Sequence, residues 1–391
     1  MTRDEQLISL CQSLIRIPSL SGQEEQVARF IEKTMHAYGY DEVQIDKHGS
    51  VLGCIRGKRP GKRILMDGHI DTVDIADRDR WTHDPFGAEI ENGRIYGRGT
   101  SDMKGSVSAM ISAAARFTKD TNRDFAGSIY VSGSVHEECF EGVATREISR
   151  LAEPDYVIIG EATSTTLKIG QRGRAEVVLE TIGKPCHSSN PEAGINAVYH
   201  MSALIEEIQK LTFRHHPVLG DGILVLTDII SSPYPGASVV PSLCRATFDR
   251  RTLVGETEES VLAQVNEVID KVKARIPQLN ARCYLAEGQE ACWTGERISA
   301  KRFFPAWLLR EDDEYVQKVR AGLEKAGIHA PISHFAFCTN GSHFCGERGI
   351  PTIGFGPSLE CLAHVVDEYI EIEQLLKACE GFCGILSELT K

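Results

Sequence analysis

The chain carries a series of histidine and acidic residues of the types that bind divalent metal ions. His69 and Asp71 stand in a Gly-His-Ile-Asp segment that follows an apolar run, and the other members come later in the sequence. The whole series comprises His69, Asp71, Asp102, Glu137, Glu138, Glu161 and His364. Two imidazoles and several carboxylates are sufficient to hold two divalent ions close together, with one carboxylate left free beside them. The sequence therefore predicts a two-metal hydrolase.

Each part of this series has an ordinary structural explanation when it is taken alone. A single His-x-Asp is more often a loop hydrogen bond, and Asp102 could simply cap the helix predicted to follow it. Glu137 and Glu138 could lie in a solvated turn, and His364 stands among apolar residues, as a core histidine does. Neighbouring carboxylates repel each other, however, unless one binds a cation and the other accepts a proton. The metal-site interpretation therefore depends on the residues taken together.

The candidate ligands follow short apolar segments that are typical of buried strands. The predicted strands are residues 64–66, 128–134 and 156–159. Helical patterns at residues 106–118 and 372–389 lie between and after them. Alternating strands and helices indicate an α/β sheet that is buried on both faces. Because ligands bind at the carboxyl edge of such sheets, His69, Glu137 and Glu161 are expected to meet there.

The pattern changes after residue 173 and predicts a second domain inserted into the first. A length of 391 residues suits two domains, since single cores stop growing near about 250–300 residues. The expected order is strand, helix, strand, strand, helix, strand over residues 175–181, 195–211, 223–230, 244–250, 257–276 and 282–286. This βαββαβ order is ferredoxin-like. We therefore expect a catalytic domain of residues 1–173 and 289–391 and an inserted domain of residues 174–288.

Composition excludes several classes of protein. A net charge of −12 argues against a nucleic-acid partner, which requires clustered lysine and arginine. The 12 cysteines form no C-x-x-C pair or repeating framework, so they are interpreted as reduced thiols and not as a structural zinc site. Residues 4–16 lack a signal-peptide pattern, and no apolar run approaches the roughly 18 residues of a membrane span. We expect a cytoplasmic protein that does not bind membranes.

The motifs, in this order and spacing, resemble the M20 metallopeptidase family. The matching segments are Gly-His-Ile-Asp, Gly-Arg-Gly-Thr-Ser-Asp-Met-Lys-Gly, His-Glu-Glu at residues 136–138, Gly-Glu-Ala at residues 160–162, and the late His364. This family includes acetylornithine deacetylase, succinyl-diaminopimelate desuccinylase, aminoacylase and carboxypeptidase G2, and the pattern is closest to the members linked to selenium metabolism. The resemblance covers nearly the whole chain. It implies a zinc-peptidase-like α/β/α catalytic domain with the inserted ferredoxin-like domain acting as lid and dimerisation domain.

The resemblance also implies a role for each residue of the series. His69 and Glu161 would bind one ion, and Glu138 and His364 the other. Asp102 would bridge the two ions, and such a pair can hold a bridging hydroxide at neutral pH because each cation lowers the pKa of bound water. Zn²⁺ is the expected metal, although carboxylate-rich sites also accept Mn²⁺ or Co²⁺.

The catalytic residues implied by the resemblance lie in both predicted domains. Glu137 would act as general base, and Asp71 would orient His69. His187, in a Lys-Pro-Cys-His-Ser-Ser segment, would polarise the scissile carbonyl, often across a dimer interface. Arg251 would clamp a substrate carboxylate. Without the family, His187 could equally be a surface histidine at a turn, and Arg251 an ordinary exposed basic residue.

A third group of residues departs from the family pattern. Thr339, Asn340 and Gly341 stand where many relatives have a Gly-Thr-Ser-Asp-like substrate loop, and they could offer a hydroxyl, an amide and a close backbone approach to a substrate. His343 is not expected to bind metal, because five ligands are already assigned.

The resemblance thus implies an enzyme that cleaves an amide bond of an N-acyl amino acid or a small peptide, in a homodimer formed through the inserted domain. Two alternatives remain at this point. A dipeptidase or aminopeptidase would share the metal site, although an aminopeptidase needs an anchor for a free amine that the sequence does not reveal. A non-catalytic metal-binding scaffold would usually lose a ligand or the base, and none is missing here.

Overall fold

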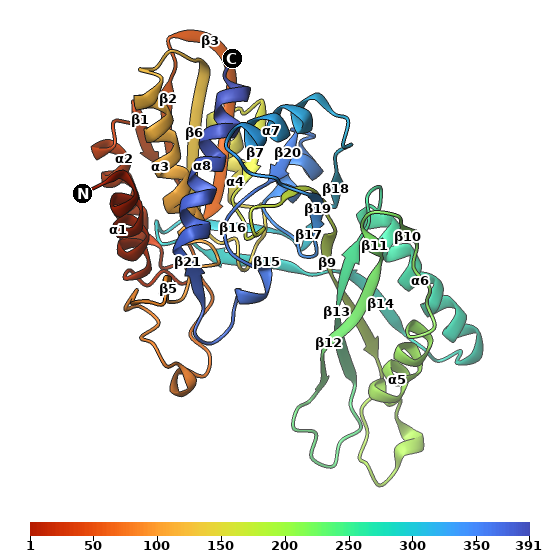
Figure 1. Cartoon of the computed structure of the whole chain (residues 1–391). Helices are drawn as coiled ribbons and strands as arrows, with labels where there is room; N and C mark the ends of the chain where they lie inside the picture. Colours follow the sequence, from red (N-terminus) through yellow and green to blue (C-terminus); the bar gives the residue numbers. More distant parts are fainter. The chain divides into compact units, whose positions relative to one another are not determined.

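The computed structural model describes residues 1–391, which form two compact units (Figure 1). Unit 1 comprises Met1–Gln171, Gln289–Ser299 and Trp307–Lys391, and unit 2 comprises Arg172–Gly288 and Ala300–Ala306. Residues 300–306 were expected in the catalytic domain but belong to unit 2. The reason is that strand β17 (Phe303–Phe304) pairs with β9 (Gly173–Ile182) of that unit.

Unit 1 is built on a mixed nine-stranded sheet with the order β1-β2-β6-β3-β7-β20-β8-β18, in which β19 also pairs with β8. The strands are β1 Glu42–Ile45, β2 Val51–Arg56, β3 Arg59–His69, β6 Ala126–Ser134, β7 Tyr156–Ile159, β8 Leu167–Gln171, β18 Trp307–Leu308, β19 Ile332–Phe335 and β20 Thr352–Gly354. At its centre, β3 runs parallel to both β6 and β7.

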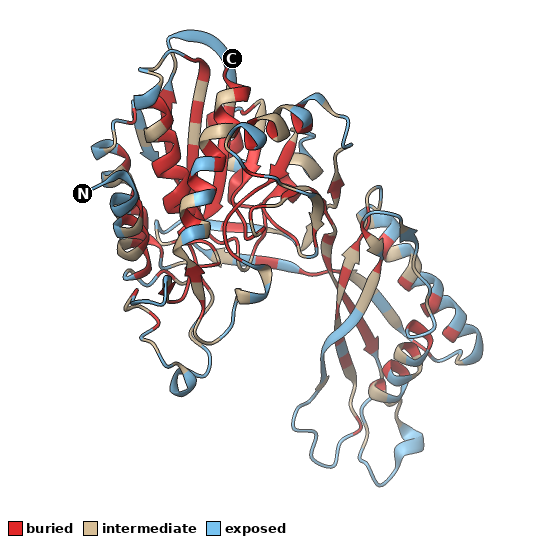
Figure 2. Ribbon diagram, viewed as in Figure 1, coloured by how far each residue is buried: buried red, intermediate tan, exposed pale blue.

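Alternate side chains of the central strands enter different cores on the two faces of this sheet. Ile64 and Met66 of β3 join the large core, whereas Leu65 between them joins a small core on the other side. Ile158 and Val157 of β7 divide in the same way. This alternation follows from the two-residue repeat of a strand and explains why these strands are continuously apolar. Figure 2 shows the sheet as the most deeply buried part of unit 1.

Helices cover both faces of the sheet, as the α/β/α prediction requires. The helices are α1 Arg3–Ile15, α2 Glu25–Ala37, α3 Lys104–Asp120, α4 Thr145–Ala152, α7 Glu314–Lys325 and α8 Ile372–Leu389. Apolar residues of all of these except α4 enter the large core, and α4 with the π-helical segment η3 (Ser342–Glu347) encloses the small one. The predicted final helix is confirmed, since α8 spans residues 372–389.

Short elements extend unit 1 around the main sheet. A three-stranded sheet joins β21 (Tyr369–Glu371), β5 (Arg94–Tyr96) and β4 (Ile90–Glu91). The remaining elements are β15 Glu287–Ala291, β16 Arg297–Lys301, η1 Arg78–Arg80 and η4 Glu360–Leu362. The β21–β5 pairing connects the segment after His364 with the segment before Asp102.

Unit 2 has a five-stranded sheet with the order β12-β13-β9-β14, in which β17 also pairs with β9, a two-stranded β10–β11 sheet and two α-helices. Its elements are β9, η2 Pro191–Ala193, α5 Ala197–Ile208, β10 His215–His216, β11 Gly220–Asp221, β12 Ile223–Ser232, β13 Leu243–Thr252, α6 Glu258–Arg275, β14 Ala281–Leu285 and β17. Apart from the small β10–β11 hairpin and β17, the order is the predicted βαββαβ. Its own core is formed by apolar residues of α5, α6 and the sheet, such as Leu204, Val265 and Phe248.

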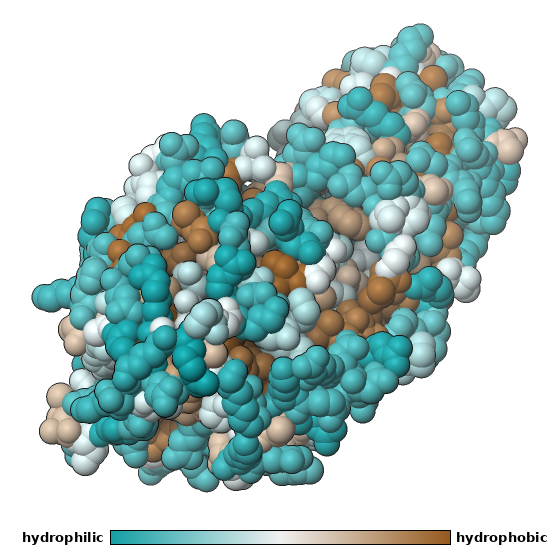
Figure 3. All heavy atoms as spheres, turned by 90° about the horizontal axis from the view of Figure 1, so that it is seen from above, coloured by the Kyte–Doolittle hydropathy of each residue, from teal (hydrophilic) through white to brown (hydrophobic).

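The helices of the protein are either too short or too polar to span a lipid bilayer. The face seen in Figure 3 is mostly hydrophilic, with apolar side chains gathered in separate patches between the polar ones.

Candidate metal centre

Three neighbouring parallel strands bring the candidate ligands to one edge of the unit 1 sheet. Because β6, β3 and β7 are parallel, their carboxyl ends lie at the same edge. His69 is the last residue of β3. Glu137 follows the end of β6 by three residues, and Glu161 follows the end of β7 by two. Short excursions from fixed strand ends therefore place the side chains, as the sequence predicted.

The carboxylate of Asp102 lies between the two histidines. Its Oδ1 atom is 2.9 Å from Nε2 of His69, and its Oδ2 atom is 3.0 Å from Nε2 of His364. His69 and His364 are 295 positions apart in the sequence, yet they face the two oxygens of one carboxylate. A carboxylate that presents one oxygen to each of two imidazoles has the arrangement that a bridging ligand requires.

Two glutamates complete this arrangement, one beside each histidine. Oε1 of Glu161 is 3.5 Å from Nε2 of His69, and Oε2 of Glu138 is 3.0 Å from Nε2 of His364. Glu137 stands further away, with Oε2 at 4.0 Å from His69 Nε2. The ligand pairs expected from the sequence are therefore adjacent in space, and Glu137 lies beside them.

The site gathers negative charge in a buried space, and the pKa values of its side chains reflect this. Burial raises the pKa of Glu161 to about 8 and raises that of Glu137 well above its ordinary value. Burial would also raise the pKa of Asp102, but its hydrogen bonds to the two imidazoles outweigh this effect and lower it. For His364, hydrogen bonds to two carboxylates raise the pKa to about 10.

These residues fit a pair of divalent cations. Ligand atoms of His69, Glu137 and Glu161 lie within 4.8 Å of one another. The same holds for His69, Asp102 and Glu138. In addition, the Oε1 atom of Glu138 is buried without a hydrogen-bond partner. Crowded carboxylates repel each other unless cations lie between them, and imidazole with carboxylate oxygen is a donor set that suits Zn²⁺, Mn²⁺ or Co²⁺.

Asp71 contacts both the His69 ring and the loop that carries Glu137 and Glu138, whereas the sequence led us to expect only a contact with His69. Its carboxylate accepts hydrogen bonds from the backbone N–H groups of Glu137 at 3.1 Å and Glu138 at 3.2 Å, and from the Ser21 hydroxyl at 2.7 Å. The nearest partner of His69 Nδ1 is the Asp71 backbone carbonyl at 2.9 Å, whereas its carboxylate is 3.6 Å away. A proton on Nδ1 leaves Nε2 free to bind a metal. Asp71 therefore fixes the glutamate loop and the ring together.

A buried ion pair supports Asp102, and no sequence pattern predicted it. Glu368 accepts hydrogen bonds from the backbone N–H groups of Ser101 at 2.8 Å and Asp102 at 3.1 Å. The same carboxylate pairs with Arg98 at 2.6 Å, and both side chains are almost fully buried. The only sequence signal is the position of Glu368, four residues after His364. An isolated glutamate at that spacing resembles any surface residue.

The side chains of the two expected active-site residues of unit 2 are accessible and pair only with nearby residues. His187 is exposed, and its Nδ1 accepts a hydrogen bond from the backbone N–H of Ser189 at 3.1 Å. In the neutral ring the proton then lies on Nε2, where it can be donated to a ligand. Arg251 is half-buried and pairs with Asp249 at 2.7 Å, whereas its neighbour Arg250 is buried against Glu256.

The side chain of Asn340 has a different environment from the one expected for a substrate contact. Its amide nitrogen donates to Asp67 and Ser134, at 2.9 Å in each case, and its oxygen accepts from the Gly142 backbone N–H at 2.8 Å. Asn340 is buried. Its hydrogen-bonding groups tie β3, β6 and the loop after Glu141 together, so the amide has a structural role in this structure.

Thr339 and Gly341 likewise face the interior. The Thr339 hydroxyl donates to Gln171 at 2.6 Å and accepts from the Gly341 N–H at 3.0 Å. A Cβ atom on Gly341 would stand 2.7 Å from the Trp307 indole, so the close approach that requires glycine is to Trp307. The expected substrate contacts of these side chains are therefore replaced by internal ones.

The α/β/α fold and the histidine-carboxylate cluster define a hydrolase of the metallopeptidase type. The family model of peptidase family M20/M25/M40 matches residues 65–388, and the chain belongs to this family. The resemblance seen in the sequence motifs is thereby confirmed.

Individual relatives cover nearly the whole chain. The chain is 34% identical to the uncharacterized protein YgeY of Escherichia coli (strain K12), over 91% of this chain and 87% of the relative. It is 28% identical to succinyl-diaminopimelate desuccinylase of Cereibacter sphaeroides (strain ATCC 17029 / ATH 2.4.9), over 94% of each. Among solved structures, Bacillus subtilis YXEP, described as a dinuclear metal binding peptidase from the M20 family, superimposes with a TM-score of 0.72 at 14% identity and covers 100% of this chain and 99% of that one.

Proposed function

We propose that this protein is a dinuclear metal-dependent hydrolase that cleaves the amide bond of an N-acyl amino acid or a small peptide. The observation that carries the proposal is the Asp102 carboxylate, which lies 2.9 Å from His69 through one oxygen and 3.0 Å from His364 through the other. Membership of a peptidase family and a desuccinylase among the relatives support amide cleavage.

Five residues hold the two ions in this proposal. His69 and Glu161 serve one ion, Glu138 and His364 serve the other, and Asp102 serves both. When bound, the ions supply Lewis-acid chemistry, which lowers the pKa of water and polarises a carbonyl. The two-histidine, three-carboxylate set favours Zn²⁺, with Mn²⁺ and Co²⁺ as alternatives.

Glu137 acts as the general base. Its carboxylate lies beside the ligand cluster, 4.0 Å from His69, and is buried away from bulk water. It can therefore accept a proton from the attacking water and then return it to the nitrogen that leaves. Asp71 keeps Glu137 in place through the backbone N–H group described above.

Two residues of unit 2 act on the substrate. His187 donates its Nε2 proton to the oxygen that becomes negative when the carbonyl is attacked. Arg251 binds the substrate carboxylate through its guanidinium. Both are accessible side chains, as groups that meet a diffusing substrate must be. The proposal gives unit 2 the role of a lid that brings these groups to the substrate.

Unit 2 also offers a surface for a homodimer. Strand β12 is at the edge of its sheet and pairs only with β13. Its apolar side chains are unusually exposed, at 50% for Val225, 47% for Ile229 and 51% for Ile230. An unpaired apolar edge strand is a ready surface for pairing with another chain. We therefore place the dimer contact on β12.

Hydrolysis of a panel of N-acetyl, N-succinyl and N-carbamoyl amino acids and dipeptides tests the proposed activity. Metal-free protein is reconstituted with Zn²⁺, Mn²⁺ or Co²⁺ before the assay, and Glu137→Gln serves as the inactive control. Turnover that requires metal and is lost in the variant supports the proposal and identifies the acyl group. A preference for dipeptides with a free amine would favour the peptidase alternative.

Metal analysis in the same experiment separates the site from the reaction. Two ions per chain with no turnover of any substrate would support the site and count against amide cleavage. Failure of the wild-type chain to bind two ions would contradict the site itself. The cytoplasmic location remains a prediction from the sequence.

A further inference from the structure

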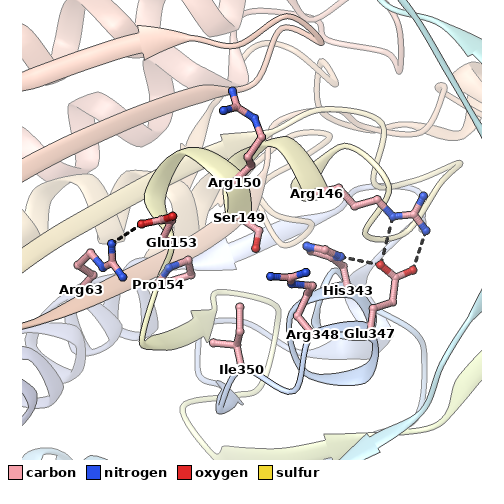
Figure 4. A pocket seen from close by; sticks show the side chains of 10 residues that line it. All are labelled: Arg63, Arg146, Ser149, Arg150, Glu153, Pro154, His343, Glu347, Arg348 and Ile350. Carbon is pink, nitrogen blue, oxygen red and sulfur yellow. Dashed lines mark hydrogen bonds and ion pairs between the residues drawn. The ribbon is translucent and has the colours of Figure 1, made fainter.

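Away from the candidate metal centre, unit 1 contains a cavity of about 700 Å³ between α4, η3 and the first half of β3 (Figure 4). This volume is within the range of small-molecule sites, roughly 300–1,000 Å³. The cavity is distinct from the metal centre, because Arg63 lines it near the start of β3 and His69 ends that strand. Six residues of strand separate the two positions by about 20 Å.

The charge of the cavity is opposite to that of the chain as a whole. Four arginines and two glutamates line it, although the chain has a net charge of −12. Three of the arginines pair with carboxylates, namely Arg63 with Glu153, Arg146 with Glu347 and Arg150 with Glu147. The fourth, Arg348, is exposed, and its guanidinium makes no hydrogen bond or ion pair. One positive group is thus free to bind a ligand.

A buried histidine supplies a second unpaired group. His343 is 4% exposed, and its Nδ1 lies 2.7 Å from Glu347. Burial alone would raise the pKa of Glu347, but hydrogen bonds from His343 and Arg146 outweigh this and lower it to about 2. Because Glu347 is ionised, it accepts the Nδ1 proton. With its proton on Nδ1, the neutral form of the ring presents Nε2 as an acceptor, and this atom is buried without a partner.

Figure 4 shows His343 and Arg348 on the η3 side of the cavity, with Ser149 of α4 facing them. The Ser149 hydroxyl, which can donate or accept, makes no hydrogen bond within the chain. Since Nε2 of His343 is screened from water, a ligand reaches it only after a neighbouring side chain moves.

We propose that this cavity binds a small oxyanion that carries its own O–H donor, of which hydrogen phosphate is the simplest. Its negative oxygens accept hydrogen bonds from Arg348 and Ser149, and its O–H donates to His343 Nε2. A guanidinium matches phosphate through two parallel hydrogen bonds. Sulfate has the same shape and a similar charge but no O–H at neutral pH, so it leaves Nε2 unpaired. This site does not depend on the proposed hydrolase function.

Isothermal titration calorimetry of the metal-loaded protein with inorganic phosphate, sulfate and glycerol phosphate at low ionic strength tests the proposal. Arg348→Gln is the principal variant, because the exposed side chain can be changed without disturbing the core. Arg310→Gln is the matched control, since Arg310 is an exposed arginine that pairs only with Asp312. Phosphate held at the metal centre is unaffected by Arg348→Gln, so only the component that the variant removes reports on the cavity.

We expect one saturable phosphate site per chain that Arg348→Gln weakens about tenfold or more and Arg310→Gln leaves unchanged. Sulfate should bind the wild-type protein more weakly than phosphate does. To His343→Phe, which lacks the Nε2 acceptor, the two anions should bind equally weakly. The dianion of glycerol phosphate has no P–O–H group, so only a glycerol hydroxyl could donate to His343; tighter binding of glycerol phosphate would identify a phosphorylated metabolite with such a hydroxyl as occupant, and tighter binding of inorganic phosphate would identify the free ion. Phosphate binding that does not saturate, that survives Arg348→Gln, or that sulfate matches would overturn the proposal.

Discussion

The metal centre of unit 1 and the substrate-facing residues of unit 2 are held in contrasting ways. Around the metal centre, residues distant in sequence meet: Glu368 supports Asp102 across 266 positions, and Asp71 supports Glu137 across 66. In unit 2, the side chains of His187 and Arg251 each contact a residue only two positions away, although their backbones pair with Val239 and with β12 and β9. Long-range contacts fix a group before the substrate arrives, whereas local ones leave it able to adjust. If the proposed function is correct, we expect unit 1 to supply the preorganised chemistry and unit 2 the substrate recognition.

Removal of the general base should produce the largest effect on activity. Glu137→Gln keeps the shape of the side chain but cannot accept a proton, so kcat should fall by about 10²- to 10⁴-fold. Metal analysis should still give two ions per chain, because Glu137 is not one of the five proposed ligands. Glu360→Gln, the same change at a glutamate that pairs with Lys168, should retain full activity. Loss of an ion in Glu137→Gln would instead make this residue a ligand.

Removal of the buried ion pair between Glu368 and Arg98 should have the next largest effect, which is a loss of stability. In Glu368→Gln the amide oxygen can still accept from the backbone, but Arg98 keeps a buried charge without a partner. Such a loss costs about 3–5 kcal/mol of unfolding free energy. Glu371→Gln breaks an exposed pair with Arg94 and should cost less than about 1 kcal/mol. Urea denaturation measures both, and equal costs would contradict the supporting role of Glu368.

A substitution at His187 in unit 2 should have the opposite effect to Glu368→Gln, because it should lower activity without lowering stability. His187→Ala should lower kcat by about 10²- to 10³-fold if His187 donates to the developing oxyanion. The melting temperature should not change, because the side chain is exposed. His215→Ala provides the control, as His215 is an exposed histidine of the same unit that pairs with Asp221. An effect on KM alone would assign His187 to binding.

The sequence could predict the central strands because they depend on local patterns, whereas the ligand roles rest on the family resemblance and stay predictions. Short apolar segments identify β3, β6 and β7, and His69, Glu137 and Glu161 stand at or just after the ends of these strands. The parallel pairing of the three strands then brings the ligands together without further information. Helix α8 was predicted to the residue, because a helical repeat and its flanking polar residues mark both ends.

The supporting contacts could not be predicted in the same way. Glu368 and Asn340 look like surface residues in the sequence, and only the folded chain shows that they are buried and where their partners lie. The segment after Asn340 forms the π-helical η3, which no periodic pattern indicates. Polar residues that bond across large sequence separations carry no local signal, so the internal hydrogen bonds of Asn340 could not be predicted, and its substrate role stays a prediction.

The substitution Asn340→Ala distinguishes a structural role of this residue from a substrate-binding role, and its effect should be smaller than those above. Asn340→Ala leaves the buried Asp67 carboxylate and the Gly142 N–H without their partner, which should cost about 2 kcal/mol of stability. Asn266→Ala, at an exposed position of α6, should cost little. Thermal denaturation and substrate kinetics measured together decide the matter. A raised KM with an unchanged melting temperature would restore Asn340 to the substrate site.

The proposed dimer contact should be removable without any loss of metal binding, because β12 is remote in sequence from every proposed metal ligand. Ile230→Lys places a charge on the exposed apolar edge and should shift the sedimentation profile toward monomer. Ile90→Lys, the same change at an exposed isoleucine of unit 1, should not alter it. Both variants should still bind two ions, because the ligands all lie in unit 1.

Activity of the Ile230→Lys monomer then tests how far unit 2 acts alone. If His187 serves the site of its own chain, the monomer should retain kcat. If His187 reaches the site of a second chain, dissociation should lower kcat by as much as His187→Ala does. Mixing Ile230-intact chains that carry His187→Ala with chains that carry Glu137→Gln separates the cases further. Recovery of activity on mixing requires that an intact base and an intact histidine come from different chains, whereas no recovery confines the chemistry to one chain.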